Sequence, residues 1–209
     1  MKIFYNKKAI SYKITGLIKS RLKKLAKIRS NICKASNKSR RDFTKKYKER
    51  WLSDYYGLQG EWAVKKFFDE NNIIYKIGLQ LGFGRNDITH DFLVITDKFN
   101  YNIGVKTTIR NKYDNIEDFL NLKRDNHKLF YPYRGERTKL RGHNYPDFLF
   151  FCFIFPDSIE NKNKVFILGF FDKIDIRNSK VRDFSDKPTH YIDSRIIKRC
   201  GRSLVYLKG

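Results

Sequence analysis

The chain has 209 residues, 41% of them apolar, and a formal net charge of +23 at pH 7. This length suffices for one domain with an extension, and the charge predicts a polyanionic partner, above all nucleic acid. Three widely separated cysteines exclude a disulfide framework and a paired-cysteine metal knuckle. No apolar stretch reaches the ~20 residues that span a bilayer, and the N-terminus lacks a signal-peptide core, so we expect a soluble protein of the reducing cytoplasm.

The first quarter of the chain holds most of the excess charge, because residues 1–51 contain 18 Lys and Arg against two acids. Apolar residues recur every three or four positions over 15–32, which predicts an amphipathic helix with a basic reverse face. A second basic helix is predicted over 39–56, where aromatic residues are spaced by four. We therefore expect residues 1–56 to form a basic helical extension.

Lysines and arginines on such helices replace the counterions condensed on phosphates, so the extension is predicted to bind nucleic acid. The residues assigned to this role are Lys23, Lys24, Lys27, Arg40, Arg41, Lys45 and Lys46. Two alternatives fit the same pattern: a solvated face that only keeps the chain in solution, and a helix that lies on anionic lipid.

The next segment, 57–70, is predicted to be a helix with one apolar side. Gly57 and Gly60 lack side chains and would let this helix approach a sheet closely. Glu61 is the candidate functional residue of the helix. A strand is predicted near 73–80.

The central stretch, 91–109, is predicted to be a β-hairpin. Its arms, 91–95 and 101–109, are rich in β-branched and aromatic residues and are separated by a polar turn. Asp91 opens the first arm, and Lys106 interrupts the second. A carboxylate and an ammonium group within a sheet are costly unless they are paired or bound to an ion, so both are candidate functional residues.

The part of the chain after the hairpin is strongly charged. A helix is predicted over 115–130 and a loop rich in arginine and tyrosine over 131–146. Basic and aromatic side chains in an irregular segment suit a phosphate backbone with unstacked bases, although an ordinary exposed connection has the same composition. The loop residues assigned to nucleic acid are Arg134, Arg137 and Arg141.

A near-continuous apolar run over 147–155 predicts a buried strand that is covered on both faces. The apolar segment 165–171 predicts its antiparallel partner. Together with the hairpin these strands predict an α/β fold, in which helices flank a central mixed β-sheet.

Glu61, Asp91 and Lys106 together have the chemistry of a metal-dependent phosphodiesterase. In such a site carboxylates hold Mg²⁺, and a lysine orients or polarises the attacking water. Each residue also has an ordinary explanation by itself. Glu61 could be an exposed acid on a helix, Asp91 a cap at the start of a strand, and Lys106 a lysine that extends to water. Their order along the chain favours the site.

Three short motifs carry this order: Gly60-Glu61 on a helix, Asp91-Phe92-Leu93-Val94 on a strand, and Gly104-Val105-Lys106-Thr107-Thr108 on the next. They resemble the PD-(D/E)XK nuclease superfamily, and the resemblance extends over roughly residues 57–171. It implies a restriction-endonuclease-like core within a nuclease domain over 57–209.

The resemblance also implies roles for individual residues. Asp91, Glu61 and the carbonyl of Val105 would hold Mg²⁺, for which Mn²⁺ can substitute. Lys106 would position the attacking water. Thr107 and Thr108 are the residues that could contact a phosphate.

One position departs from the family pattern. The family usually carries an acid two residues before the lysine, where this chain has Gly104. A replacement ligand would have to come from elsewhere in the chain. Glu61 is the first candidate, followed by Asp87 and Glu117.

Three functional classes remain open at this point. The first is a metal-dependent DNA endonuclease of restriction, homing or mobile-element type. The second is a nucleic-acid-binding protein that keeps the nuclease fold without catalysis, and the third is a basic RNA- or ribosome-associated protein. DNA is favoured over RNA as the partner, no membrane partner is expected, and double-strand cleavage would favour a homodimer.

Overall fold

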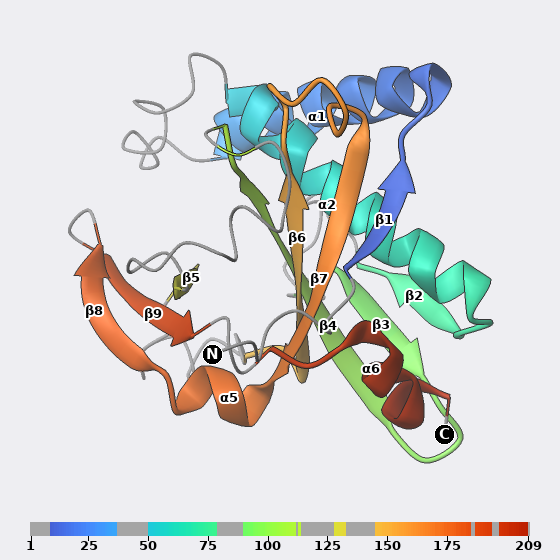
Figure 1. The fold of residues 1–209 in the computed structure, drawn as a ribbon, viewed down its shortest axis with the longest axis vertical. Helices are drawn as coiled ribbons and strands as arrows, with labels where there is room; N and C mark the ends of the chain where they lie inside the picture. The colour runs from blue at the N-terminus through green and yellow to red at the C-terminus, as the bar shows by residue number, and fades with distance from the viewer. Residues whose placement is uncertain are drawn as a thin grey trace.

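The computed structural model describes residues 9–36, 50–78, 90–111, 113, 128–132, 145–184, 187–193 and 197–208. These residues form a six-stranded mixed sheet, a three-stranded sheet and helices (Figure 1). The helices are α1 (Gly16–Ser36), α2 (Arg50–Glu70), α5 (Lys173–Arg177) and α6 (Cys200–Leu207). The large sheet contains β1 (Ile10–Lys13), β2 (Tyr75–Ile77), β3 (Phe92–Ile95), β4 (Asn100–Ile109), β6 (Phe148–Ile154) and β7 (Lys164–Asp172). The small sheet contains β5 (Lys128–Pro132), β8 (Lys180–Phe184) and β9 (Lys187–Asp193).

The large sheet has the strand order β1-β7-β6-β4-β3-β2. Its β4–β6 pair is parallel, and its other pairs are antiparallel. The predicted hairpin is confirmed as β3 and β4, with Phe92 opposite Ile103. The strands predicted near 73–80, 147–155 and 165–171 are confirmed as well, the first in the shorter form of β2. The α/β class and the mixed sheet are therefore as predicted.

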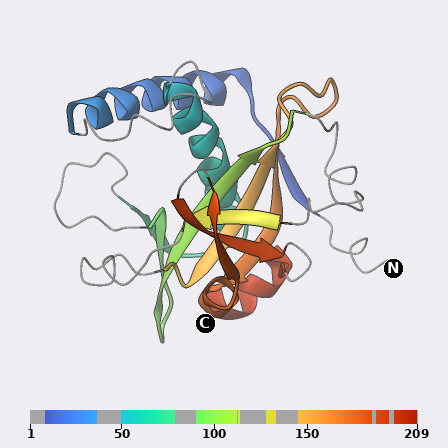
Figure 2. The ribbon, with the colours of Figure 1, turned by 90° about the vertical axis from the view of Figure 1, so that its left-hand side faces the viewer.

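Strand β6 lies at the centre of the molecule, and all of its residues are buried. Successive side chains of a strand point to opposite faces, so β6 contributes to two cores. Phe148, Phe150, Cys152 and Ile154 pack in the core that contains α2, whereas Leu149, Phe151 and Phe153 pack in the core that contains residues of β5 and β9. The small sheet lies in front of the large one in Figure 2. The predicted burial of this strand on both faces is thus confirmed.

Helix α2 packs closely on the large sheet. The residues that it buries there are Ala63, Val64, Phe67 and Phe68. A Cβ atom at Gly60 would lie 2.0 Å from Oγ1 of Thr107 and 3.2 Å from Cβ of Cys152, so the helix can lie this close only because residue 60 is glycine. A Cβ atom at Gly57 would have no neighbour within 4 Å. Of the two glycines predicted to permit close approach, Gly60 is the one at the contact.

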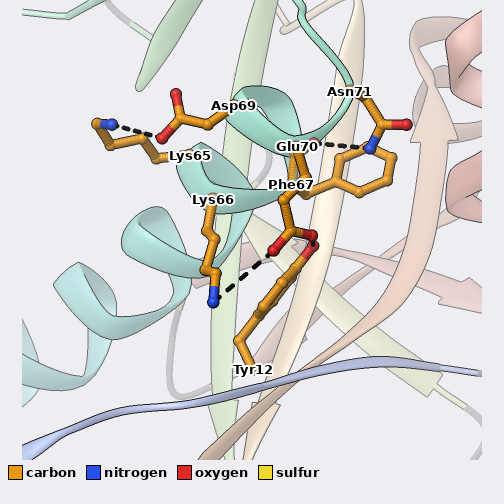
Figure 3. Close-up of polar contacts among 7 residues, drawn as sticks. All are labelled: Tyr12, Lys65, Lys66, Phe67, Asp69, Glu70 and Asn71. Atoms are coloured by element: carbon orange, nitrogen blue, oxygen red, sulfur yellow. Dashed lines mark hydrogen bonds and ion pairs between the residues drawn. The ribbon is translucent and has the colours of Figure 1, made fainter.

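The last turn of α2 is bonded to both edge strands of the large sheet. Tyr12 on β1 donates a hydrogen bond to Glu70 at 2.8 Å, and Tyr75 on β2 donates one to Asp69 at 2.6 Å. Lysines one turn earlier on the helix pair with the same two acids (Figure 3). Burial, together with the hydrogen bond to Glu70, raises the pKa of Tyr12. We call the Tyr12–Glu70 and Tyr75–Asp69 contacts the tyrosine clamp.

The N-terminal basic segment is part of the same structure as the sheet. β1 pairs with β7, and α1 packs on α2 through a small core of Leu22, Ala26 and Tyr55. The helix predicted over 15–32 is confirmed as α1. Among the described residues, no helix is both long and apolar enough to cross a membrane.

Two predicted helices meet in α2, which runs without a break from Arg50 to Glu70. Residues 50–56, from the end of the second basic helix predicted over 39–56, therefore belong to the helix that carries Glu61. The division predicted after residue 56 falls inside α2. The remainder of that basic helix, residues 39–49, lies outside the described residues.

The prediction of a helix over 115–130 is wrong at its C-terminal end, where β5 begins at Lys128. The loop predicted over 131–146 is likewise a strand at its first two residues. β5 pairs with the distant β9 and buries Leu129 between the sheets, so tertiary pairing decides the conformation here. Residues 114–127 and 133–144 lie outside the described residues.

Candidate active site

Asp91 immediately precedes β3, at the end of the β3–β4 pairing. Its backbone N–H donates to the carbonyl of Ile103 at 2.9 Å, and its carboxylate accepts a hydrogen bond from the N–H of Val105 at 2.5 Å. The N–H and C=O of one residue in an extended strand point to the same side. The carbonyl oxygen of Val105 therefore also faces the Asp91 side of β4, so the two predicted oxygen donors share one edge of this strand.

Glu61 lies on the same side of α2 as Phe68, which packs on the large sheet. It precedes Phe68 by seven residues, and the ring of Phe68 lies 5.5 Å from that of Phe92. Residues seven apart share one side of a helix, so Glu61 lies on the same side as Phe68. Gly60, which precedes it, rests on Thr107 of β4. Helix α2 thus carries Glu61 over the part of β4 that extends past the start of β3.

The buried thiol of Cys152 interacts electrostatically with both carboxylates. Burial raises its pKa well above the ordinary value, and the charges of Cys200, Asp91 and Glu61 raise it further. Cys152 lies opposite Thr107 in the register of β6 and β4. Asp91 and Glu61 therefore approach the same region of the sheet.

Glu61 is paired with a residue that the sequence prediction did not include. Nη1 of Arg29 on α1 lies 3.3 Å from Oε1 of Glu61, and the two side chains are 23% and 12% exposed. Burial tends to lower the pKa of Arg29, but the charges of Glu61, Asp54 and Asp91 outweigh it, and the pKa is raised. One guanidinium group thus interacts electrostatically with three carboxylates.

Lys106 lies on the face of β4 opposite to α2. Val105 and Thr107 pack on the α2 face, so alternation places Lys106 on the other face, where it lies opposite Phe151 of β6. Burial lowers the pKa of Lys106, and the charge of Asp91 opposes that shift in part. Asp91 is therefore within electrostatic reach of Lys106, whereas Glu61 and Lys106 approach β4 from opposite faces.

Gly104 occupies a crowded position rather than an open one. It lies opposite Leu149 in the register of β4 and β6. A Cβ atom at this position would lie 3.0 Å from Cγ of Pro146 and 3.2 Å from Cδ1 of Leu149. An acid at residue 104 would require these neighbours to shift.

The residues assigned to nucleic acid fall into three groups. Lys23 and Lys27 on α1 lie over the rings of Tyr55 and Trp51, at 5.9 and 5.5 Å from the ring centroids, and Lys24 is exposed beside them. On β4, the Thr107 hydroxyl donates to the carbonyl of Gly57 at 3.4 Å, which turns it toward α2, whereas alternation places Thr108 on the other face. The remaining assigned residues, Arg40, Arg41, Lys45, Lys46, Arg134, Arg137 and Arg141, lie outside the described residues.

The oxygen donors of this region are compatible with Mg²⁺. This ion usually keeps several waters and takes only one or two protein carboxylates, and Asp91 and Glu61 with the carbonyl of Val105 match that set in kind. Within the described ranges, no three acids, histidines or cysteines are grouped so that they could hold a metal ion. The alternative ligands Asp87 and Glu117 lie outside those ranges.

Sequence reasoning missed two charged residues of this region, Asp54 and Arg29. Asp54 precedes Glu61 by seven residues, so helical spacing could have found it, had residues 50–70 been predicted as one helix. Arg29 has no such signal, because only the packing of α1 on α2 brings it to Glu61.

Comparisons of the chain with protein-family models, with curated proteins and with solved structures found no match in any of the three.

Proposed function

We propose that this protein is a metal-dependent endonuclease with a restriction-endonuclease-like core, and that it hydrolyses phosphodiester bonds of nucleic acid, DNA rather than RNA. The observation that carries this proposal is the position of Asp91. Its carboxylate shares one edge of β4 with the carbonyl of Val105, within electrostatic reach of both Lys106 and Arg29, the partner of Glu61. This is the order of helix acid, strand acid and strand lysine that the sequence motifs share with the PD-(D/E)XK superfamily.

Asp91, Glu61 and the Val105 carbonyl would hold Mg²⁺. A bound magnesium ion supplies Lewis-acid stabilisation of negative charge on the phosphate oxygens and lowers the pKa of a bound water. Lys106 would hold the attacking water. Because burial lowers the pKa of its ammonium group, Lys106 gives up a proton more readily than an exposed lysine does, and its amine can then hydrogen-bond to that water.

Several features support a nucleic acid as the substrate. The charge of +23 favours a polyanion, and the lysines of α1 lie on the helix that also delivers Arg29 to Glu61. The basic helix therefore adjoins the candidate site. A phosphate backbone that follows α1 would pass close to the acids of α2.

A second candidate function is nucleic-acid binding without catalysis on the same fold. The observation that favours it is the environment of Gly104, where Pro146 and Leu149 fill the space that a third acid would need. A site with two carboxylates and no third acid would then bind nucleic acid and leave it intact.

A nicking assay separates the two functions. Supercoiled plasmid is incubated with the protein in Mg²⁺ or Mn²⁺, beside the variants Asp91→Asn and Asp97→Asn. Asp97 is an exposed residue of the β3–β4 turn, so its variant controls for the loss of one carboxylate. The endonuclease function predicts that the unchanged protein and Asp97→Asn nick the plasmid and that Asp91→Asn does not. Tight plasmid binding without nicking in either metal would establish the second function instead.

A further inference from the structure

Arg29 pairs with Glu61, whose carboxylate the proposed function assigns to the metal ion. The pair joins α1 to α2 at 3.3 Å, and it is mostly shielded from water. Arg29 is followed by Ser30, which is 2% exposed, so the backbone of α1 is held against its neighbours here. The guanidinium group is therefore positioned by packing as well as by charge.

Arg29 is the cation that pairs with Glu61 in this structure. Glu61, Asp54 and Asp91 all interact electrostatically with Arg29, so one guanidinium group is shared by three carboxylates. A divalent cation placed between Asp91 and Glu61 would share these carboxylates with Arg29. Two cations at one set of acids repel each other, so a metal ion at Glu61 would weaken the pairing of Glu61 with Arg29.

We propose that Arg29 competes with the metal ion for Glu61, and that it pairs with a phosphate of the nucleic acid once the ion has taken its place. This inference rests on the proposed function. A guanidinium group remains charged at all relevant pH values and matches the oxygens of a phosphate with two parallel N–H donors. Arg29 thus acts as a positioning residue that couples metal binding to nucleic-acid binding, a role that none of the sequence motifs assigns.

The first test measures Mn²⁺ binding to the full chain without nucleic acid, from the electron paramagnetic resonance signal of free Mn²⁺. Arg29→Gln is compared with Arg21→Gln, which makes the same change at an exposed position of α1. We expect Arg29→Gln to bind Mn²⁺ about tenfold more tightly, within the range common for coupled sites, and Arg21→Gln to bind like the unchanged protein. Arg29→Met, which keeps an unbranched side chain without charge, replaces Arg29→Gln if that variant does not fold.

A double-mutant cycle shows whether the effect passes through Glu61. In the Glu61→Gln background, Arg29→Gln should no longer tighten Mn²⁺ binding, because the negative charge for which the two cations compete is gone. Equal Mn²⁺ affinity in the unchanged protein and Arg29→Gln, with binding that still depends on Asp91, would overturn the inference and leave the proposed function standing. Absence of any Mn²⁺ binding that depends on Asp91 would overturn the proposed function, and the inference with it.

The phosphate arm of the proposal is tested with a short DNA duplex in the Lys106→Ala background, which keeps the duplex intact. Mn²⁺ should increase duplex affinity, and the increase should be about tenfold smaller when Arg29 is also changed to Gln, because linkage makes the coupling reciprocal. An equal increase with and without Arg29 would show that its guanidinium does not reach the phosphate, and would overturn this arm.

Discussion

The carboxylate of Asp91 accepts a hydrogen bond from the backbone N–H of Val105, the residue immediately before Lys106. Asp91 therefore has a structural contact in addition to its proposed metal contact. Asparagine at this position keeps an oxygen that can accept the same hydrogen bond, whereas alanine does not. The two substitutions at Asp91 can therefore separate its structural role from its proposed catalytic role.

We expect Asp91→Asn to abolish cleavage with little change in the free energy of unfolding, and Asp91→Ala to abolish cleavage and lower that free energy by about 1–3 kcal/mol. Without metal, both variants should bind DNA at least as tightly as the unchanged protein, because a carboxylate facing a phosphate is repulsive. Urea unfolding and fluorescence anisotropy measure the two quantities. Equal destabilisation by Asn and Ala would argue against the structural contact.

For Lys106, we expect Lys106→Ala to abolish cleavage, to leave the fold intact and to weaken DNA binding only slightly. Burial of the ammonium group costs free energy, so its removal is not expected to destabilise the sheet. The isosteric variant Lys106→Met should behave in the same way. Cleavage by either variant at the rate of the unchanged protein would remove Lys106 from the mechanism.

The stability of the protein should also depend on pH through Lys106. Its pKa is lower in the folded than in the unfolded state, so the unfolded state binds the proton more tightly. The free energy of unfolding of the unchanged protein, relative to Lys106→Met, should therefore rise with pH from the folded pKa to the unfolded value of about 10.4. Below the folded pKa, Lys106 is charged in both states, so the full free-energy cost of burying its ammonium group remains. Urea unfolding of both proteins at neutral and alkaline pH tests the sign.

For Glu61, we expect Glu61→Ala to reduce Mg²⁺-dependent cleavage as severely as a change of Asp91 does. Gly104 supplies no ligand, so the helix carboxylate carries more of the proposed metal site. Plasmid nicking over a range of Mg²⁺ concentrations is the measurement. Full activity of Glu61→Ala would refute this role and direct attention to Asp87 or Glu117.

The contact between α2 and β4 predicts opposite effects at two glycines of one helix. Gly60→Ala should lower the free energy of unfolding by about 1–3 kcal/mol, because the new methyl group meets Thr107 and Cys152. Gly57→Ala faces open space and should raise it by about 0.5–1 kcal/mol through helix propensity. Thr107→Ala, combined with Gly60→Ala, should recover part of the loss. Thermal unfolding of the four proteins checks this order.

The lysines of α1 should govern the salt dependence of DNA binding. Deletion of the basic segment would also remove β1 and the partner of α2, so substitution by glutamine is the cleaner change. The residues to change together are Lys23, Lys24 and Lys27. The slope of log K against log salt should become shallower by about 0.9 for each phosphate that the variant no longer neutralises. Glutamines at three exposed lysines of other elements should leave the slope unchanged, and these are Lys76, Lys162 and Lys180.

Much of the fold follows from local patterns. The strand over 148–154 is apolar at every position because both of its faces are buried. A continuous apolar run of this length is typical of such a strand. The hairpin arms are rich in β-branched and aromatic residues, and of the two glycines predicted to permit close approach, Gly60 is at the contact and Gly57 is not.

The rest depends on partners far along the chain. β1 has only four residues, and β7 stabilises it from the other end of the sequence. Lys128–Pro132 adopts a strand because β9 pairs with it, although the preceding residues favour a helix. Arg29 reaches Glu61 through the packing of one helix on another, which no spacing within either helix encodes. The positions of Asp91 and Lys106 at two adjacent strands were therefore predictable, and the pairing of Arg29 with Glu61 was not.

The tyrosine clamp affects how the edges of the large sheet open. Edge strands normally fray, and their amide protons then exchange with solvent at a low free energy of opening. Here Tyr12 and Tyr75 tie both edges to one helical turn, so β1 and β2 should open together with α2. The basic helix α1 lies between β1 and α2 along the chain and is therefore anchored at both sides. In the proposed complex with nucleic acid, α1 would therefore act as part of a rigid body, not as a tethered arm that samples sites ahead of the core.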